Sequence, residues 1–164
     1  MLTGTERWDA YTLLPEKIEE QELKRELEEM RIPTAAYCRL SLEGEDSIDN
    51  QVKLVHDYIN ESPDLLLVDT YIDNGLTGTN FDRPEWNRLM LDVQQGRINA
   101  IVVKDLSRFG RHYVEAGTYI AKIFPKLGVR FIAITDGFDS TKPGELSRIL
   151  VPVKNMMNDL LCDV

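Results

Sequence analysis

One serine and four arginines stand where three apolar segments of the sequence give way to loops. They are Ser41, Arg39, Arg83, Arg108 and Arg111. An arginine guanidinium is planar, donates two parallel hydrogen bonds to two oxygens of one phosphate, and is always positively charged. A serine hydroxyl beside such groups could form a covalent phosphoserine, while the arginines stabilise the developing charge without a metal. The residue types in these loops therefore indicate phosphoryl-transfer chemistry.

The same residues also allow a purely structural interpretation. Ser41 could cap a turn, and the arginines have many acidic residues with which to pair. Two further serines in these loops fit structural roles, since Ser47 stands where a helix N-cap is expected and Ser107 suits a turn. The residue types alone leave phosphate chemistry and simple capping both open.

Alternating strand and helix patterns supply the frame for these loops. Short apolar runs predict buried strands at 34–38, 65–72, 100–103 and 129–134. Periodicity and capping residues predict helices at 48–59, between Pro84 and Gly96, at 114–127, and from about Gly144 onward. This alternation favours an α/β domain with a mostly parallel central sheet flanked by helices.

The three loops begin after predicted strands, at Cys38, Ile72 and Val103. In open parallel sheets, ligands bind at the carboxyl ends of the strands. We therefore expect the serine and the arginines to meet at one edge of the sheet. The second loop is long and contains glycines, as functional loops often do.

The composition excludes several classes of protein. The chain has 164 residues, of which 43% are hydrophobic and 29% charged, as expected for one globular domain. Two cysteines cannot form a disulfide framework or a four-ligand zinc site. No apolar run approaches the roughly 18 residues of a membrane span, and the N-terminus lacks a secretory signal pattern. We expect a cytoplasmic protein.

The negative charge is concentrated in the first 30 residues. Residues 1–30 hold nine acidic and four basic side chains, and so carry five of the nine net negative charges. The segment from Pro15 to Met30 is rich in strong helix formers with a thin apolar stripe, which predicts an acidic helical arm that is either solvated or in contact with a partner. The acidic balance argues against indiscriminate nucleic-acid binding but leaves room for a small basic site.

Four motifs, in this order, resemble those of the serine recombinases, the family of resolvases, invertases, large integrases and transposases. They are Tyr-x-Arg-x-Ser at 37–41, Ser-Ile-Asp-x-Gln at 47–51, Asp-x-Gly-x-Thr-Gly at 73–78 with Asp-Arg-Pro at 82–84, and Val-Val-Lys-Asp-Leu-Ser-Arg-Phe-Gly-Arg at 102–111. The resemblance covers about residues 33–160. The last motif is most similar to the large serine recombinases of transposons and other mobile elements.

The resemblance implies a resolvase-like catalytic domain that ends in a long C-terminal helix and performs site-specific DNA recombination. Ser41 would attack a DNA phosphodiester to form a 5′-phosphoserine and release a 3′-hydroxyl, before strand exchange and religation. The four arginines match the phosphate-binding arginines of the family. The resemblance also implies that the reaction uses no metal or cofactor. Gln51 matches a supporting glutamine, and Asp73 matches a supporting acid. The chain departs from the pattern at Ser107, where many small resolvases have an aspartate.

The family pattern also implies a domain organisation and a set of partners. We expect the arm at 1–30, the catalytic domain at 31–142, and at 143–164 the start of an oligomerisation helix that is truncated before a DNA-binding region. Such a chain would pair as a dimer, form a tetramer around double-stranded DNA, and be inactive without the missing region. The alternative is a truncated, non-catalytic assembly module that only pairs with full-length recombinase.

Overall fold

The computed structural model of the chain describes residues 4–40, 47–74, 83–106 and 117–148. The chain divides into two compact units, Met1–Arg31 and Ile32–Val164. The first unit contains helix α1 (Gly4–Glu29), and the second contains an α/β sheet with its covering helices.

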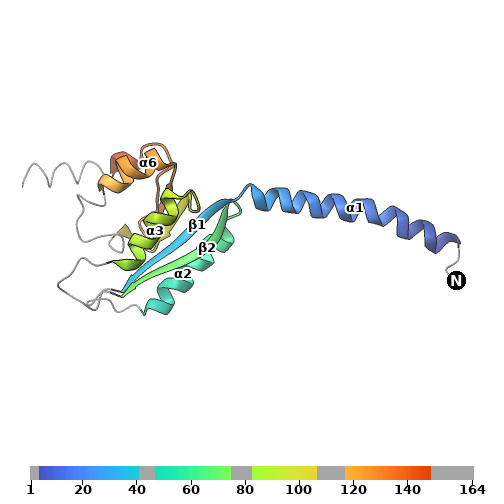
Figure 1. Cartoon of the computed structure of the whole chain (residues 1–164), viewed down its shortest axis with the longest axis horizontal. Helices are drawn as coiled ribbons and strands as arrows, with labels where there is room; N and C mark the ends of the chain where they lie inside the picture. The colour runs from blue at the N-terminus through green and yellow to red at the C-terminus, as the bar shows by residue number, and fades with distance from the viewer. Residues whose placement is uncertain (1–3, 41–46, 75–82, 107–116, 149–164) are drawn as a thin grey trace, which may run out of the picture. The chain divides into compact units, whose positions relative to one another are not determined.

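The second unit is built on a five-stranded sheet (Figure 1). Its strands are β1 (Ile32–Leu40), β2 (Leu65–Asn74), β3 (Ala100–Val103), β4 (Arg130–Ala133) and β5 (Phe138–Asp139). The strand order is β2-β1-β3-β4-β5, and the first four strands are parallel. The predicted α/β class and mostly parallel sheet are confirmed. The antiparallel strand β5 was not predicted, because two residues are too short to produce a recognisable apolar pattern.

Helices cover both faces of this sheet, so the central strands β1 and β3 are buried on each side. Figure 1 shows α2 (Ile48–Glu61) on one side of β1 and β2, and α3 (Pro84–Gln94) with α6 (Phe124–Leu127) on the other. We call these two sides the α2 face and the α3 face. The α2 face is packed by Val55, Ile59, Ala36, Cys38 and Val102. The α3 face is packed by Trp86, Leu89, Phe124, Tyr37, Tyr71, Ile101 and Phe131.

The helix ends follow from local sequence signals. The Ser47 hydroxyl accepts a hydrogen bond from the Asn50 N–H at 3.2 Å, as expected of the N-cap of α2. Pro84 is the first residue of α3. The described part of the helix predicted at 114–127 runs from 117, and Gly128, at φ 68°, ends it.

This last helix contains a π-helical turn, η1 (Tyr119–Ile123), directly before α6. The cause lies in Pro125, which has no N–H and whose ring would meet the carbonyl of Ala121 in a regular helix. The wider π turn contains Ala121 and relieves that crowding. Of the C-terminal helix, residues 145–148 are helical, and residues 149–164 lie outside the described part of the chain.

The pairing of β1 with β2 contains a β-bulge. Thr34 pairs with Leu67 but Ala35 pairs with Asp69, so Val68 is an extra residue in β2. Beyond the bulge Arg39 pairs with Asp73. A ladder that kept the first register throughout would have placed Ile72 opposite Arg39. Because a shift of one residue exchanges the two faces of a strand, the register beyond the bulge matters for the site.

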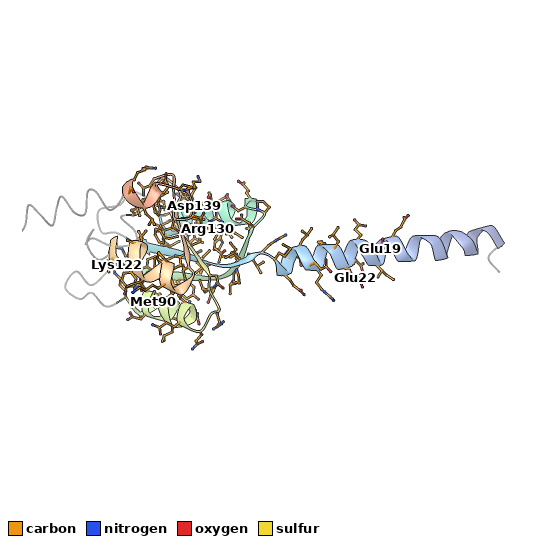
Figure 2. The ribbon with its side chains drawn as sticks, turned by 90° about the horizontal axis from the view of Figure 1, so that it is seen from above. Glu19, Glu22, Met90, Lys122, Arg130 and Asp139 are labelled. Carbon is orange, nitrogen blue, oxygen red and sulfur yellow. The ribbon has the colours of Figure 1, made fainter. Side chains whose placement is uncertain are left out.

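Helix α1 forms its own unit and exposes every described side chain from 16 to 29. The apolar residues Ile18, Leu23 and Leu27 are all more than half exposed. Acidic side chains such as Glu19 and Glu22 project from the helix (Figure 2). Among the described residues, no helix is long and apolar enough to cross a membrane.

Candidate active site

Arg39 is held at the end of β1 by a side chain from α2. The strand runs on to Leu40, so Arg39 belongs to the sheet and not to the loop in which the sequence pattern placed it. Gln51, in the first turn of α2, is only 2% exposed. Its Oε1 accepts the Arg39 N–H at 3.0 Å and its Nε2 donates to the Arg39 carbonyl at 3.3 Å. Gln51 thus satisfies both backbone polar groups of Arg39, which fixes the backbone of that residue.

Asp73 holds the start of α3. It too lies in a strand, β2, rather than in the predicted loop, and it is 5% exposed. Its Oδ1 accepts the Glu85 N–H at 3.0 Å, and its Oδ2 accepts the Trp86 N–H at 3.0 Å. These N–H groups have no acceptor within the helix. The negative charge of the carboxylate also interacts favourably with the positive end of the helix dipole.

Arg83 is the N-cap residue of α3, but its side chain makes no capping hydrogen bond. The Asp73 carboxylate, from a neighbouring strand, performs that task instead. This arrangement fixes the backbone at Arg83 while its guanidinium is not used for capping. The side chain of Arg83 is half-buried.

Tyr37 links these residues electrostatically. Its hydroxyl donates to Asp73 Oδ2 at 2.9 Å. Burial and the nearby Asp73 charge raise the pKa of Tyr37, while the positive charges of Arg83 and Arg39 act in the opposite direction. The phenol therefore remains a protonated donor to Asp73. Both arginines lie close enough for their charges to act on this hydroxyl.

Tyr37 begins the first of the four motifs but was not among the predicted site residues. The available signal was its spacing, because a hydroxyl-bearing residue two positions before Arg39 shares its face of the strand. The backbone N–H groups at the start of α3 were also missed, because their use depends on the approach of Asp73 from another element.

The structure therefore brings four of the predicted site residues to the carboxyl ends of β1 and β2. They are Arg39, Gln51, Asp73 and Arg83. The other three, Ser41, Arg108 and Arg111, lie outside the described residues. Ser41 is separated from Arg39 by Leu40 alone, and Arg108 follows the last described residue of its segment, Leu106, by two positions.

The chemical character of this edge is cationic and suited to an oxyanion. Arg39 and Arg83 supply fixed positive charge, and Asp73 already accepts three hydrogen bonds from protein donors. Within the described ranges, no group of three or more His, Cys, Asp or Glu side chains could hold a metal ion. Such an edge can bind a phosphate group and stabilise added negative charge on it.

The chain belongs to the resolvase family. The family model described as "Resolvase, N terminal domain" matches residues 34–163, which is most of the chain. The recognition of a serine recombinase catalytic domain from the four motifs is thereby confirmed. No curated protein matches the chain.

Solved structures of recombinases share this fold. A resolvase family site-specific recombinase from Streptococcus pneumoniae is 26% identical, with a TM-score of 0.67, and the match covers 81% of this chain and 93% of that one. The N-terminal catalytic domain of TP901-1 integrase is 23% identical, with a TM-score of 0.67, and the match covers 78% of this chain and 98% of that one. The C-terminal catalytic domain of ISC1926 TnpA, an IS607-like serine recombinase, has a TM-score of 0.52 at 21% identity, with 74% and 77% covered.

Proposed function

We propose that this chain is the catalytic domain of a site-specific DNA recombinase in which Ser41 is the nucleophile. The Ser41 oxygen forms a bond to the phosphorus of a DNA phosphodiester, and the bond from phosphorus to the 3′-oxygen breaks. The 3′-oxygen leaves with a proton as a 3′-hydroxyl, and the 5′-phosphate stays on Ser41. After strand exchange, a 3′-hydroxyl attacks the phosphoserine, restores the phosphodiester and releases the serine.

The observation that carries this proposal is the pair of hydrogen bonds between the Gln51 side chain and the backbone N–H and carbonyl of Arg39. An arginine that stabilises a phosphoryl-transfer transition state must be held in place before the substrate arrives. If the arginine has to move during the reaction, that movement costs free energy and the transition state is stabilised less. Gln51 holds the Arg39 backbone on both sides, and the next residue but one is Ser41. A surface arginine with only a structural role would not need a buried amide to fix it.

The remaining site residues take roles that fit their contacts. Arg39 and Arg83 bind the scissile phosphate from β1 and from the start of α3, and Arg108 and Arg111 join them from the segment after β3. Asp73 is a positioning residue, because it sets the start of α3 at Arg83. Gln51 is the positioning residue of Arg39.

The proposed partners are double-stranded DNA and further copies of the chain. The catalytic domain would span 31–142, and the segment from 143, helical at 145–148, would begin the helix through which subunits pair as dimers and tetramers. The acidic arm at 1–30 stays outside this assignment.

The test is to trap the covalent intermediate and identify the residue that carries it. The protein and a pool of randomised duplexes are incubated at high concentrations, so that the catalytic domain meets DNA without the affinity that a DNA-binding region would add. Each duplex is nicked so that a short cleaved strand diffuses away and religation fails. After nuclease digestion, mass spectrometry locates the peptide that bears the 5′-phosphate remnant. We expect it on Ser41 in the wild type, and no adduct in Ser41→Ala.

Ser47→Ala is the matched control, because Ser47 is a neighbouring serine that caps α2. We expect it to keep the adduct and to lose about 1 kcal/mol of stability. An adduct that persists in Ser41→Ala would move the chemistry to another residue, with Ser107 as the next candidate. A wild type without any adduct would contradict the enzyme proposal and favour a non-catalytic assembly module.

A further inference from the structure

A tight turn joins β4 to β5 at the same edge of the sheet as the candidate active site. The Gly137 N–H donates to the Ile134 carbonyl at 3.1 Å, and Gly137 has φ 60°, a conformation that favours glycine. Beyond the turn, Phe138 pairs with Ala133 in the antiparallel ladder. The turn therefore projects at the carboxyl end of β4, next to the carboxyl end of the parallel strand β3.

This turn is bonded to the segment that follows β3. The Thr135 N–H donates to the Lys104 carbonyl at 2.8 Å, and the Thr135 hydroxyl donates to the same carbonyl at 3.0 Å. The Leu106 N–H donates to Asp136 Oδ2 at 2.7 Å. The backbone bond lies beyond the last pair of β3 and β4 and needs no particular side chain, whereas the two side-chain bonds depend on the identities of Thr135 and Asp136.

The hydrogen bond from Leu106 to Asp136 gives an acceptor to an N–H group that lacks one within its helix. Leu106 is the first helical residue after β3, and the first N–H groups of a helix have no acceptor within it. A carboxylate acceptor at this position is strengthened by its charge. The Leu106 side chain packs against the core of the α3 face. Leu106 is thus held through its side chain by the core and through its N–H by Asp136.

Thr135 and Asp136 are both exposed and contribute nothing to the core. Exposed polar residues of this kind are usually replaceable at little cost in stability. Their bonds nevertheless reach across 30 or 31 positions of sequence to the same short segment. That segment leads to Arg108 within two residues.

We propose that Asp136, assisted by Thr135, is a positioning residue that sets the start of the segment carrying Arg108 and Arg111. The inference rests on the proposed function, in which these arginines bind the scissile phosphate. Asp136 acts through Leu106 and does not touch the DNA. A displacement of about 1 Å at a catalytic group can lower the rate up to about 100-fold. The loss of one exposed hydrogen bond that sets this position can therefore lower the reaction rate.

The test combines the adduct assay with amide hydrogen exchange at Leu106. Asp136→Ala removes the acceptor, Asp136→Asn keeps an acceptor oxygen, and Thr135→Val removes one hydroxyl. Thr141→Val is the matched control, because its hydroxyl bonds Asp139 instead of the segment after β3. We expect Asp136→Ala to speed exchange at Leu106 about fivefold to tenfold and to slow adduct formation about 10-fold or more.

The pattern across variants separates positioning from general stability. Asp136→Asn should recover most of the adduct rate and the Leu106 protection, and Thr141→Val should leave both unchanged. In Asp136→Ala the DNA concentration that gives half the maximal rate should change far less than the maximal rate, because binding by the other arginines remains. The thermal midpoint should stay close to that of the wild type.

Three results would overturn the inference. Unchanged exchange at Leu106 in Asp136→Ala would show that the contact does not hold this residue. Faster exchange with an unchanged adduct rate would show that the contact does not position the arginines. An Asp136→Asn variant as slow as Asp136→Ala, but with Leu106 protected, would assign the effect to charge. A wild type without an adduct would instead refute the proposed function, and the exchange comparison would still decide whether the contact exists.

Discussion

The Tyr37 hydroxyl donates to the Asp73 carboxylate across the two neighbouring parallel strands, at 2.9 Å and in a buried setting. The same carboxylate accepts two N–H groups from the start of α3. One acidic side chain therefore ties β1, β2 and α3 together at the edge where Arg39 and Arg83 lie. Its position determines the geometry of the candidate site.

Tyr37→Phe should weaken this connection without destroying it. The substitution removes one hydrogen bond to a charged group, and Asp73 keeps its two backbone donors, so we expect a loss of about 1.5–3 kcal/mol. Asp73→Ala should cost more, because it leaves the buried Tyr37 hydroxyl and two helix N–H groups without their acceptor. Urea unfolding of both variants measures the difference. Equal stability of Asp73→Ala and wild type would contradict this account.

Gln51→Glu should lower both stability and activity, although glutamine and glutamate have nearly the same size. A glutamate at this position can accept the Arg39 N–H but, when ionised, cannot donate to the Arg39 carbonyl, which would then face a carboxylate oxygen. We expect a destabilisation of about 1–3 kcal/mol and a clear loss of adduct formation. The adduct assay and urea unfolding at neutral pH check this. Asn50→Asp serves as a control, because it adds a negative charge at the neighbouring exposed residue, whose side chain does not bond the Arg39 backbone.

Stability should depend on pH through Asp139. Burial raises the pKa of Asp139, but hydrogen bonds from Arg130 and Thr141 outweigh this and lower it from 3.8 to about 2. Figure 2 shows Arg130 and Asp139 beside each other, with Arg130 Nη2 at 2.7 Å from Asp139 Oδ2. Because the unfolded state binds the proton more tightly, the contribution is complete above about pH 4 and disappears as the pH falls to about 2.

The size of this contribution is about 2 kcal/mol. Asp139→Asn should be less stable than wild type at pH 6 and should lose most of the slope between pH 4 and pH 2. Urea unfolding at a series of pH values measures both. An unchanged slope in Asp139→Asn would assign the acid sensitivity to other carboxylates.

Deletions in β2 should have different effects according to whether the bulge can absorb them. Removal of Val68 takes out the extra residue and leaves a regular ladder in which Asp73 still pairs with Arg39. Removal of both Val68 and Thr70 takes out one residue more than the bulge supplies, so Asp73 shifts by one position and turns toward the other face. We expect the Val68 deletion to stay folded and active, and the double deletion to unfold or lose the adduct. Circular dichroism and the adduct assay distinguish them, and the opposite order would contradict the assigned register.

The sequence by itself determined the family and most of the helices and strands. Ser47, Pro84 and Gly128 are local signals, because capping, a fixed φ and a left-handed φ act within a few residues of the chain. Continuous apolar runs predicted the buried parallel strands, and the ordered motifs singled out Arg39, Gln51, Asp73 and Arg83 before any geometry was available. These signals are readable because each depends on near neighbours in the chain.

The tertiary structure decided how those residues work together. The bulge at Val68 sets which residue of β2 faces Arg39, and the caps at α3 and at Leu106 come from Asp73 and Asp136, which belong to other elements. Strand β1 includes Arg39, which pairs with Asp73 of β2 and whose backbone N–H and carbonyl bond the Gln51 side chain. Hydrogen bonds between groups that are far apart in the chain depend on the register and packing of whole strands and helices. Local residue preferences carry no information about that register.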